Sequence, residues 1–153
     1  MKAIVKLWML IGLVSNVFAA DCVLTVTKDN CWNNYDVNIH FFDGETGQNV
    51  AQLVVPANQN WGRVKFTCHA SQIFTATAKF SPDIWEGDSA KTYNSDRVWT
   101  LPEVAPAGDT VWAINMCYGK DFATLPQPLN AKNCKCDPKA APAYDFKVTD
   151  VNA

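Results

Sequence analysis

Hydrophobic and polar residues alternate with a period of two along much of the chain between residues 22 and 117. Val37, Ile39 and Phe41, for example, are separated from one another by single polar residues. Strict alternation of this kind predicts β-strands that bury one face. We therefore expect a chain built from strands, because frequent glycine and proline residues interrupt any long amphipathic helix.

Turn residues divide this pattern into segments of strand length. The run Asp-Gly-Glu-Thr-Gly at residues 43–47 separates two such segments and predicts a β-hairpin. The expected strands cover residues 23–27, 37–41, 50–55, 64–68, 73–80, 97–101 and 110–117, with 144–151 as a final edge strand. Short strands at this spacing predict an all-β fold over residues 21–153, a single antiparallel β-sandwich that is immunoglobulin-like or jelly-roll-like and stapled by disulfides.

The segment at about 118–143 does not follow the alternation. It contains four prolines and two closely spaced cysteines, Cys134 and Cys136. A loop of this length without secondary structure is uncommon in a compact domain. We therefore expect disulfide bonds from these two cysteines to hold the segment against the sandwich.

The first twenty residues have the pattern of a secretory signal peptide. Two lysines precede an apolar run of eight residues, 7–14, and small residues follow at the positions expected before a cleavage site. The apolar run is shorter than the roughly 20 residues that a membrane-spanning helix needs. We expect a mature chain that starts at Ala20 or Asp21, is secreted or periplasmic in a bacterium, and has no membrane span. Asp21 disfavours a lipid-modified Cys22.

All six cysteines lie beyond this expected cleavage site. They are Cys22, Cys31, Cys68, Cys117, Cys134 and Cys136. An even number of cysteines in an exported chain predicts three disulfides. The sequence leaves their pairing open, except that Cys134 and Cys136 are too close to bond each other comfortably. A metal site built from Cys134 and Cys136 with His40 or His69 is the alternative, and the C-x-C spacing and an oxidising compartment disfavour it.

Composition and charge limit the class of partner. The chain has 153 residues, of which 48% are hydrophobic and 12% aromatic, enough for one domain with a substantial core. Its net charge is −2, and removal of Lys2 and Lys6 with the signal peptide leaves 11 basic against 15 acidic residues, a net charge of −4. A nucleic-acid partner is not expected, because such proteins need a basic surface.

The sequence contains no motif of a known catalytic class. It lacks G-x-S-x-G, H-E-x-x-H and the P-loop, and no spacing singles out a pair of carboxylates for glycoside hydrolysis. We therefore expect neither catalytic residues nor a cofactor, and a small secreted hydrolase remains the enzymatic alternative. No metal is expected, although Asp83, Glu86 and Asp88 could supply oxygen ligands to calcium. Aspartates in such loops also commonly bond their own turn.

Tryptophan is the strongest compositional signal. Trp99 and Trp112 lie within strand patterns and are expected in the core. Trp32, Trp61 and Trp85 lie among polar turn residues, where an indole either caps the core or offers a flat face to a ligand. The predicted ligand-binding residues are Trp61, Trp85, Trp32, Tyr35, Asn60 and Arg63.

An exported, disulfide-bonded sandwich with tryptophans in asparagine-rich loops is broadly similar to small carbohydrate-binding modules. The similarity lies in architecture and composition and contains no diagnostic motif. The leading hypothesis is a secreted, non-enzymatic binding module that recognises a glycan or a host-surface ligand through loop aromatics. The alternative is a protein-binding adhesion or virulence factor, because tryptophan and tyrosine are also enriched at the centres of protein interfaces.

Overall fold

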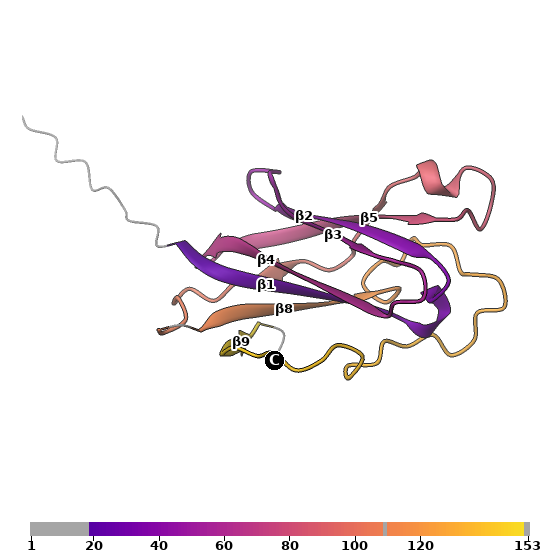
Figure 1. The fold of residues 1–153 in the computed structure, drawn as a ribbon. Helices are drawn as coiled ribbons and strands as arrows, with labels where there is room; N and C mark the ends of the chain where they lie inside the picture. Colours follow the sequence, from indigo (N-terminus) through magenta and orange to yellow (C-terminus); the bar gives the residue numbers. More distant parts are fainter. Residues whose placement is uncertain (1–18, 109, 152–153) are drawn as a thin grey trace, which may run out of the picture.

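Two β-sheets pack face to face in the computed structural model, which describes residues 19–108 and 110–151 (Figure 1). The first sheet contains β1 (Ala19–Lys28), β4 (Trp61–His69), β8 (Val111–Tyr118) and β9 (Val148–Asp150). The second contains β2 (Asp36–Asp43), β3 (Asn49–Val55), β5 (Ile73–Ser81), β6 (Tyr93–Asn94) and β7 (Trp99–Thr100). Two short 3-10 helices, η1 (Asn30–Trp32) and η2 (Asp88–Ala90), lie in connections. The predicted β-sandwich is thereby confirmed, whereas the expected signal peptide lies almost wholly outside the described residues.

The sheet order combines antiparallel and parallel pairs. The strands of the first sheet follow the order β4-β1-β8-β9, and those of the second follow β3-β2-β5-β6, with β7 also paired to β5. Both β1 with β8 and β8 with β9 are parallel pairs. Alternation predicts that a strand exists and which face it buries, but it does not specify the direction of the neighbouring strand. The short strand β6 was not predicted, and the final strand is shorter than expected.

The predicted hairpin is formed by β2 and β3. Asp43 organises its turn, because Oδ1 accepts hydrogen bonds from the N–H groups of Glu45 at 3.0 Å and Thr46 at 2.7 Å. Its other oxygen, Oδ2, accepts a hydrogen bond from Gln72 Nε2 at 2.6 Å. The bonds from Thr46 and Gln72 are the main reasons that the pKa of Asp43 falls to about 2. The turn sequence thus supplies its own hydrogen-bond acceptor.

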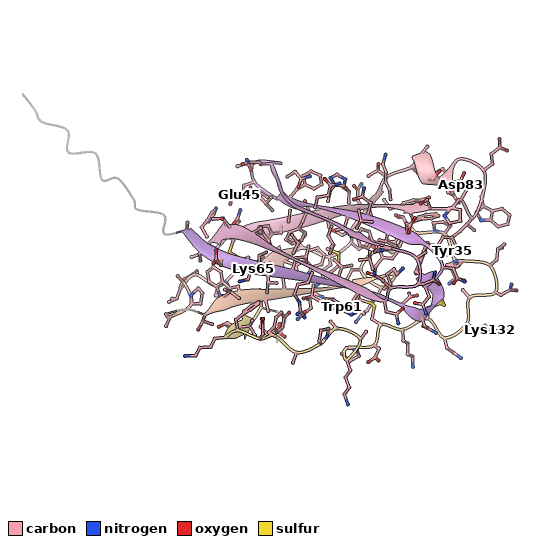
Figure 2. The ribbon with its side chains drawn as sticks, in the orientation of Figure 1. Tyr35, Glu45, Trp61, Lys65, Asp83 and Lys132 are labelled. Atoms are coloured by element: carbon pink, nitrogen blue, oxygen red, sulfur yellow. A yellow bond between two sulfur atoms is a disulfide. The ribbon has the colours of Figure 1, made fainter. Side chains whose placement is uncertain are left out.

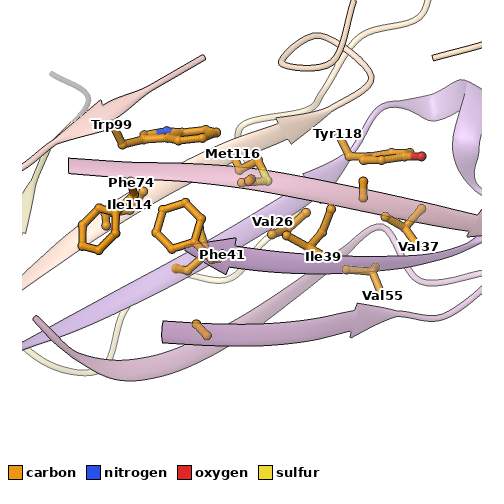
Figure 3. Packing of buried hydrophobic residues seen from close by; sticks show 14 of the residues in the cluster. Val26, Val37, Ile39, Phe41, Val55, Phe74, Trp99, Ile114, Met116 and Tyr118 are labelled. Atoms are coloured by element: carbon orange, nitrogen blue, oxygen red, sulfur yellow. The ribbon is translucent and has the colours of Figure 1, made fainter. Parts of the chain in front are cut away.

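Inward-facing residues of both sheets form one hydrophobic core (Figure 3). Trp99 and Trp112 are buried in it, as predicted. A smaller cluster lies on the opposite, outer face of the first sheet, where Tyr144 and Phe146 of the C-terminal segment cover Val23 of β1. This second layer explains why successive residues of β1 are apolar, since both faces of that strand are covered.

Three disulfides staple the sandwich, as predicted. Cys22 pairs with Cys68, Cys31 with Cys134, and Cys117 with Cys136. The two close cysteines therefore have different partners. Residues 119–147 contain no helix or strand, and the last two disulfides attach this segment to the end of β8 and to η1.

Candidate ligand-binding site

The connections that carry the predicted binding residues meet at one end of the sandwich, which we call the loop end. It comprises residues 29–35, 56–60, 82–92 and 119–143. Strand register places them there, because Thr27 of β1 lies opposite Trp61, Lys28 lies beside Tyr118, and Asp36 of β2 lies opposite Ser81. Figure 2 shows Tyr35, Asp83 and Lys132 at this end, far from Glu45.

The segment 119–143 is attached to η1 by two hydrogen bonds in addition to its disulfide. The N–H of Asn30 donates to the carbonyl oxygen of Lys135 at 3.2 Å, and the N–H of Lys135 donates to Asn30 Oδ1 at 2.7 Å. The Cys31–Cys134 bond lies beside this pair. These contacts join parts of the chain that are about a hundred residues apart, so sequence periodicity carries no signal for them.

A cavity of about 670 Å³ lies between the start of η1 and residues 117–138. Most of its wall is apolar or formed by the disulfide cysteines. The apolar wall residues with large side chains or proline rings are Trp32, Phe122, Leu125, Pro126, Pro128 and Pro138. Asp29, Lys120 and Lys135 supply the charged groups. Such a combination of apolar walls and few polar groups is typical of small-ligand sites.

Asp29 places a carboxyl group in the cavity wall. Its side chain is 5% exposed and caps η1, where Oδ1 accepts a hydrogen bond from the N–H of Cys31 at 2.9 Å. Burial raises the pKa of this carboxyl above its ordinary value, while backbone hydrogen bonds from Cys31 and Trp32 oppose the shift. Gly119 lies against it with φ of 112°, and a Cβ atom at that position would collide with Asp29 Oδ2. Glycine is therefore needed there for two reasons.

Trp32 and Tyr35, two predicted binding residues, contact each other. Trp32 is 2% exposed and meets Tyr35, Phe80 and Tyr118 edge to face at centroid distances of 5.2, 4.9 and 5.0 Å. Its indole is thus a cap of the core that also lines the cavity. Of the two alternatives that the sequence left open for this indole, the structure shows the core cap, because η1 folds it inward.

Trp61, Arg63 and Asn60 form a separate group at the start of β4. Trp61 is half-buried and belongs to the strand, not to the preceding turn as predicted. The Arg63 guanidinium carbon lies 5.3 Å from the ring centroid of Trp61 and 4.1 Å from that of Tyr144. Asn60 is exposed, and its carbonyl oxygen accepts from the N–H of Lys28 at 2.8 Å. The contact between Arg63 and Tyr144 helps to hold the C-terminal segment on the outer face of the first sheet.

Trp85 is the exposed member of the predicted set. It is 62% exposed, and it forms no aromatic pair with any described residue. Two aspartates hold its loop, because Asp88 Oδ2 accepts from the N–H of Trp85 at 2.8 Å and Asp83 accepts from the N–H of Gly87 at 3.0 Å. The structure does not bring Trp85 into contact with Trp61 or Trp32.

The acidic loop uses its carboxylates internally. Asp88 forms an ion pair with Lys91 at 2.8 Å, and this hydrogen bond is the main cause of its lowered pKa. The pKa of Asp83 is lowered chiefly by a hydrogen bond from the Ser89 side chain. Glu86 is exposed, and the side-chain oxygens of Asp83, Glu86 and Asp88 do not converge within 4.8 Å. The calcium candidate is therefore not supported, because these aspartates form the turn.

The alternative metal site built from cysteines is also not supported, because Cys134 and Cys136 form disulfides. Among the described residues, only Asp29, Cys31 and Cys134 bring three potential metal-binding atoms within 4.8 Å, and the two sulfurs are bonded to each other. Cys136 is likewise in a disulfide. His40 Nδ1 lies 2.9 Å from Asn49 Nδ2 on the neighbouring strand, so this histidine pairs across strands.

Sequence reasoning missed Asp29, Lys120 and Lys135. Sequence signals exist for two of these residues, Asp29 and Lys135. Asp29 precedes a short polar turn, as an N-cap residue does, and Lys135 lies between two cysteines with separate partners. Neither signal locates the cavity, because its walls come from distant parts of the chain.

The described residues include no helix that is both long enough and apolar enough to cross a membrane. Comparison with known proteins adds no relative, because no protein-family model, curated protein or solved structure matches this chain.

Proposed function

We propose that this chain is an exported, non-enzymatic binding module whose ligand occupies the cavity at the loop end. The observation that carries the proposal is the cavity itself, about 670 Å³ in volume, within the roughly 300–1,000 Å³ typical of small-ligand sites. A disulfide and two hydrogen bonds, one of them to the Asn30 side chain, join η1 to residues 134 and 135 of the wall. Walls held in this way lose little conformational entropy when a ligand binds.

The composition of the wall favours binding over hydrolysis. Among the described residues that line it, Asp29 is the sole carboxylic acid, and none is histidine or serine. General acid–base catalysis by paired carboxylates would require a second acid within reach of the same substrate. The hydrolase alternative is therefore less well supported than a binding function.

A variant that fills the cavity tests this proposal. Ala123→Trp adds an indole to the wall, whereas Thr124→Trp adds one at the adjacent exposed position, which does not line the cavity. A library of glycans and small metabolites would be screened by thermal shift against the wild type and both variants. A compound present at about 100 times its Kd should stabilise the wild type by about 2.7 kcal/mol, a shift of several degrees in Tm.

The expected result is a compound that stabilises the wild type and the Thr124→Trp variant but not the Ala123→Trp variant. Both unliganded variants should melt near the wild-type temperature, because both positions are exposed. Failure to find any stabilising compound, or equal shifts in both variants, would contradict a ligand site in this cavity.

A second candidate function is supported by Trp85. An indole that is 62% exposed on a loop fixed by two aspartates can stack against a sugar ring or enter a protein interface. Both the glycan hypothesis and the adhesion hypothesis would use this residue. They would differ in the partner and not in the residue that makes the contact.

Trp85→Ala tests this second function. The variant should keep the wild-type Tm, since little of the indole is buried, and should lose affinity by about 1–3 kcal/mol on a glycan array or a panel of cell-surface proteins. Val104→Ala removes a more exposed apolar side chain and serves as the matched control. A large fall in the Tm of Trp85→Ala, or unchanged binding, would contradict the assignment.

A further inference from the structure

The charged groups of the cavity wall differ in sign and in burial. Lys120 and Lys135 are exposed residues that line the cavity, and neither ammonium group forms an ion pair or hydrogen bond with another described residue. The carboxyl group of Asp29 is buried in the wall and already accepts a hydrogen bond from the Cys31 N–H. The cavity thus offers two unpaired cationic groups and one carboxyl group, of which one oxygen already accepts a hydrogen bond.

The apolar part of the wall is broad and rigid. Leu125 and Pro126 are half-buried and expose apolar surface to the cavity, whereas Trp32 and Phe122 are almost completely buried. Prolines at residues 126, 128 and 138 restrict the backbone of the wall. An apolar ligand body placed here would contact side chains that are already fixed. The wall therefore selects for a ligand with substantial apolar surface.

We propose that the cavity binds an amphiphilic organic anion, with the apolar body against Leu125 and Pro126 and the anionic group at Lys120 and Lys135. This inference rests on the proposed binding function and specifies the chemical class of its ligand. A carboxylate near the two ammonium groups would gain charge-assisted hydrogen bonds that a neutral head group cannot form at the same strength.

A cationic amphiphile is the opposite alternative, because Asp29 could attract it. Two observations make it less favourable. Two lysines would repel the cation at the same wall, and Asp29 Oδ1 is occupied by the Cys31 N–H. The desolvation that raises the pKa of Asp29 also weakens its tendency to remain charged.

A series of ten-carbon amphiphiles separates these alternatives. Decanoate, decanol and decyltrimethylammonium share one apolar chain and differ in head-group charge, so each can be titrated into the full mature protein by calorimetry. Decanoate should bind about tenfold more tightly than decanol, and the cation more weakly than either. Equal affinities for the anion and the cation, or tighter binding of the cation, would overturn the inference.

Variants of the lysines then locate the head group. The double variant Lys120→Ala/Lys135→Ala should lower decanoate affinity about tenfold, to the level of decanol, and leave decanol binding unchanged. Lys132→Ala/Lys139→Ala removes two lysines of the same segment that do not line the cavity, and it should change neither affinity. Equal loss in both double variants would indicate a diffuse charge effect and would overturn the assignment to Lys120 and Lys135.

The variant Asp29→Asn should change decanoate affinity in the opposite direction. The amide keeps an oxygen that can accept from the Cys31 N–H, while the variant removes a negative charge from the wall, so decanoate affinity should rise. Circular dichroism and Tm would confirm that the variant is folded. A fall in decanoate affinity in the folded variant would contradict the proposed arrangement.

Failure of this inference can be distinguished from failure of the binding function. If no ten-carbon compound binds, but a library compound stabilises the wild type and not the Ala123→Trp variant, then the cavity binds a ligand of another class. If neither assay shows binding that depends on the cavity, both proposals fail.

Discussion

Lys28 is the last residue of β1 and points between the sheets, in phase with the core residues Leu24 and Val26. It is 2% exposed, and its ammonium group donates hydrogen bonds to the carbonyl oxygens of Tyr35 at 2.8 Å and Pro56 at 2.9 Å. Burial lowers the pKa of Lys28 from 10.5 to about 8. The negative charge of an aspartate on β2 raises this pKa, but by less than burial lowers it. A buried cation at the loop end thus ties two connections together at an electrostatic cost.

This shifted pKa predicts a rise in stability at alkaline pH. Between pH 8 and 10.5 the unfolded chain binds more protons at Lys28 than the folded chain does, so the free energy of unfolding increases with pH across that window. The increase should reach about 3 kcal/mol in urea unfolding experiments. Lys28→Met should lack this increment, and an identical pH profile in the two proteins would contradict the assignment.

Tyr118 presents a different residue-scale feature. Its ring packs against Trp32 and Phe122, but its hydroxyl is buried and has no hydrogen-bond partner among the described residues. Burial of that hydroxyl also raises its pKa. An unpaired buried polar group destabilises the folded state.

Tyr118→Phe should therefore maintain the free energy of unfolding or raise it by about 1 kcal/mol, since the ring contacts remain. Tyr118→Ala, which removes the ring, should lower it by about 3–5 kcal/mol. Both values can be measured by urea unfolding. A loss of more than about 1 kcal/mol in Tyr118→Phe would show that the hydroxyl does have a partner.

At the scale of elements, the segment 119–147 has no helix or strand and is held by its attachments. Cys31–Cys134 spans 103 residues of sequence and Cys117–Cys136 spans 19. In the loop-entropy account a disulfide stabilises more when it closes a longer loop. The two bonds attached to the same segment should therefore differ in their effect on stability.

Removing each bond with paired cysteine-to-alanine substitutions tests this difference. Loss of Cys31–Cys134 should cost about 5 kcal/mol and loss of Cys117–Cys136 about 3 kcal/mol in urea unfolding. The first variant should also bind any cavity ligand more weakly, because this bond joins the cavity walls. A reversed order of stabilities would indicate that strain or residual structure outweighs loop entropy.

Trp61 and Arg63 belong to β4, the edge strand of the first sheet, and their contacts there indicate a structural role. Arg63 Nε donates to Thr25 Oγ1 at 2.9 Å, and Arg63 Nη2 donates to the carbonyl oxygen of Pro142 at 2.9 Å. The guanidinium also lies near the rings of both Trp61 and Tyr144. Trp61 therefore has a structural role in attaching the C-terminal segment, and Trp85 is better placed to meet a partner.

At the scale of the whole molecule, three disulfides and the absence of a free cysteine among the described residues fit an oxidising compartment. Export remains a prediction from the first twenty residues. The purified exported protein should start at Ala20 or Asp21, and its mass should be that of the reduced mature chain less six hydrogens. Free thiols or a retained N-terminus, detected by intact-mass spectrometry, would contradict the prediction.

The main strands and the hairpin could be predicted from sequence, because alternation and turn chemistry act between residues close together in the chain. Val37, Ile39 and Phe41 all face the core as their spacing predicts. The number of disulfides followed from the even cysteine count, and the different partners of Cys134 and Cys136 followed from their closeness. These features depend on local geometry, which the sequence encodes directly.

Tertiary structure alone decided the candidate site. Whether Trp32, Trp61 and Trp85 are buried, half-buried or exposed depends on neighbours from other strands, and nothing in their similar polar surroundings distinguishes them. The cavity exists because Asn30 bonds Lys135, about a hundred residues further along the chain. Hydrophobic patterning determined which face of each strand is buried, whereas long-range contacts determined which polar residues meet at the loop end and which of them remain exposed.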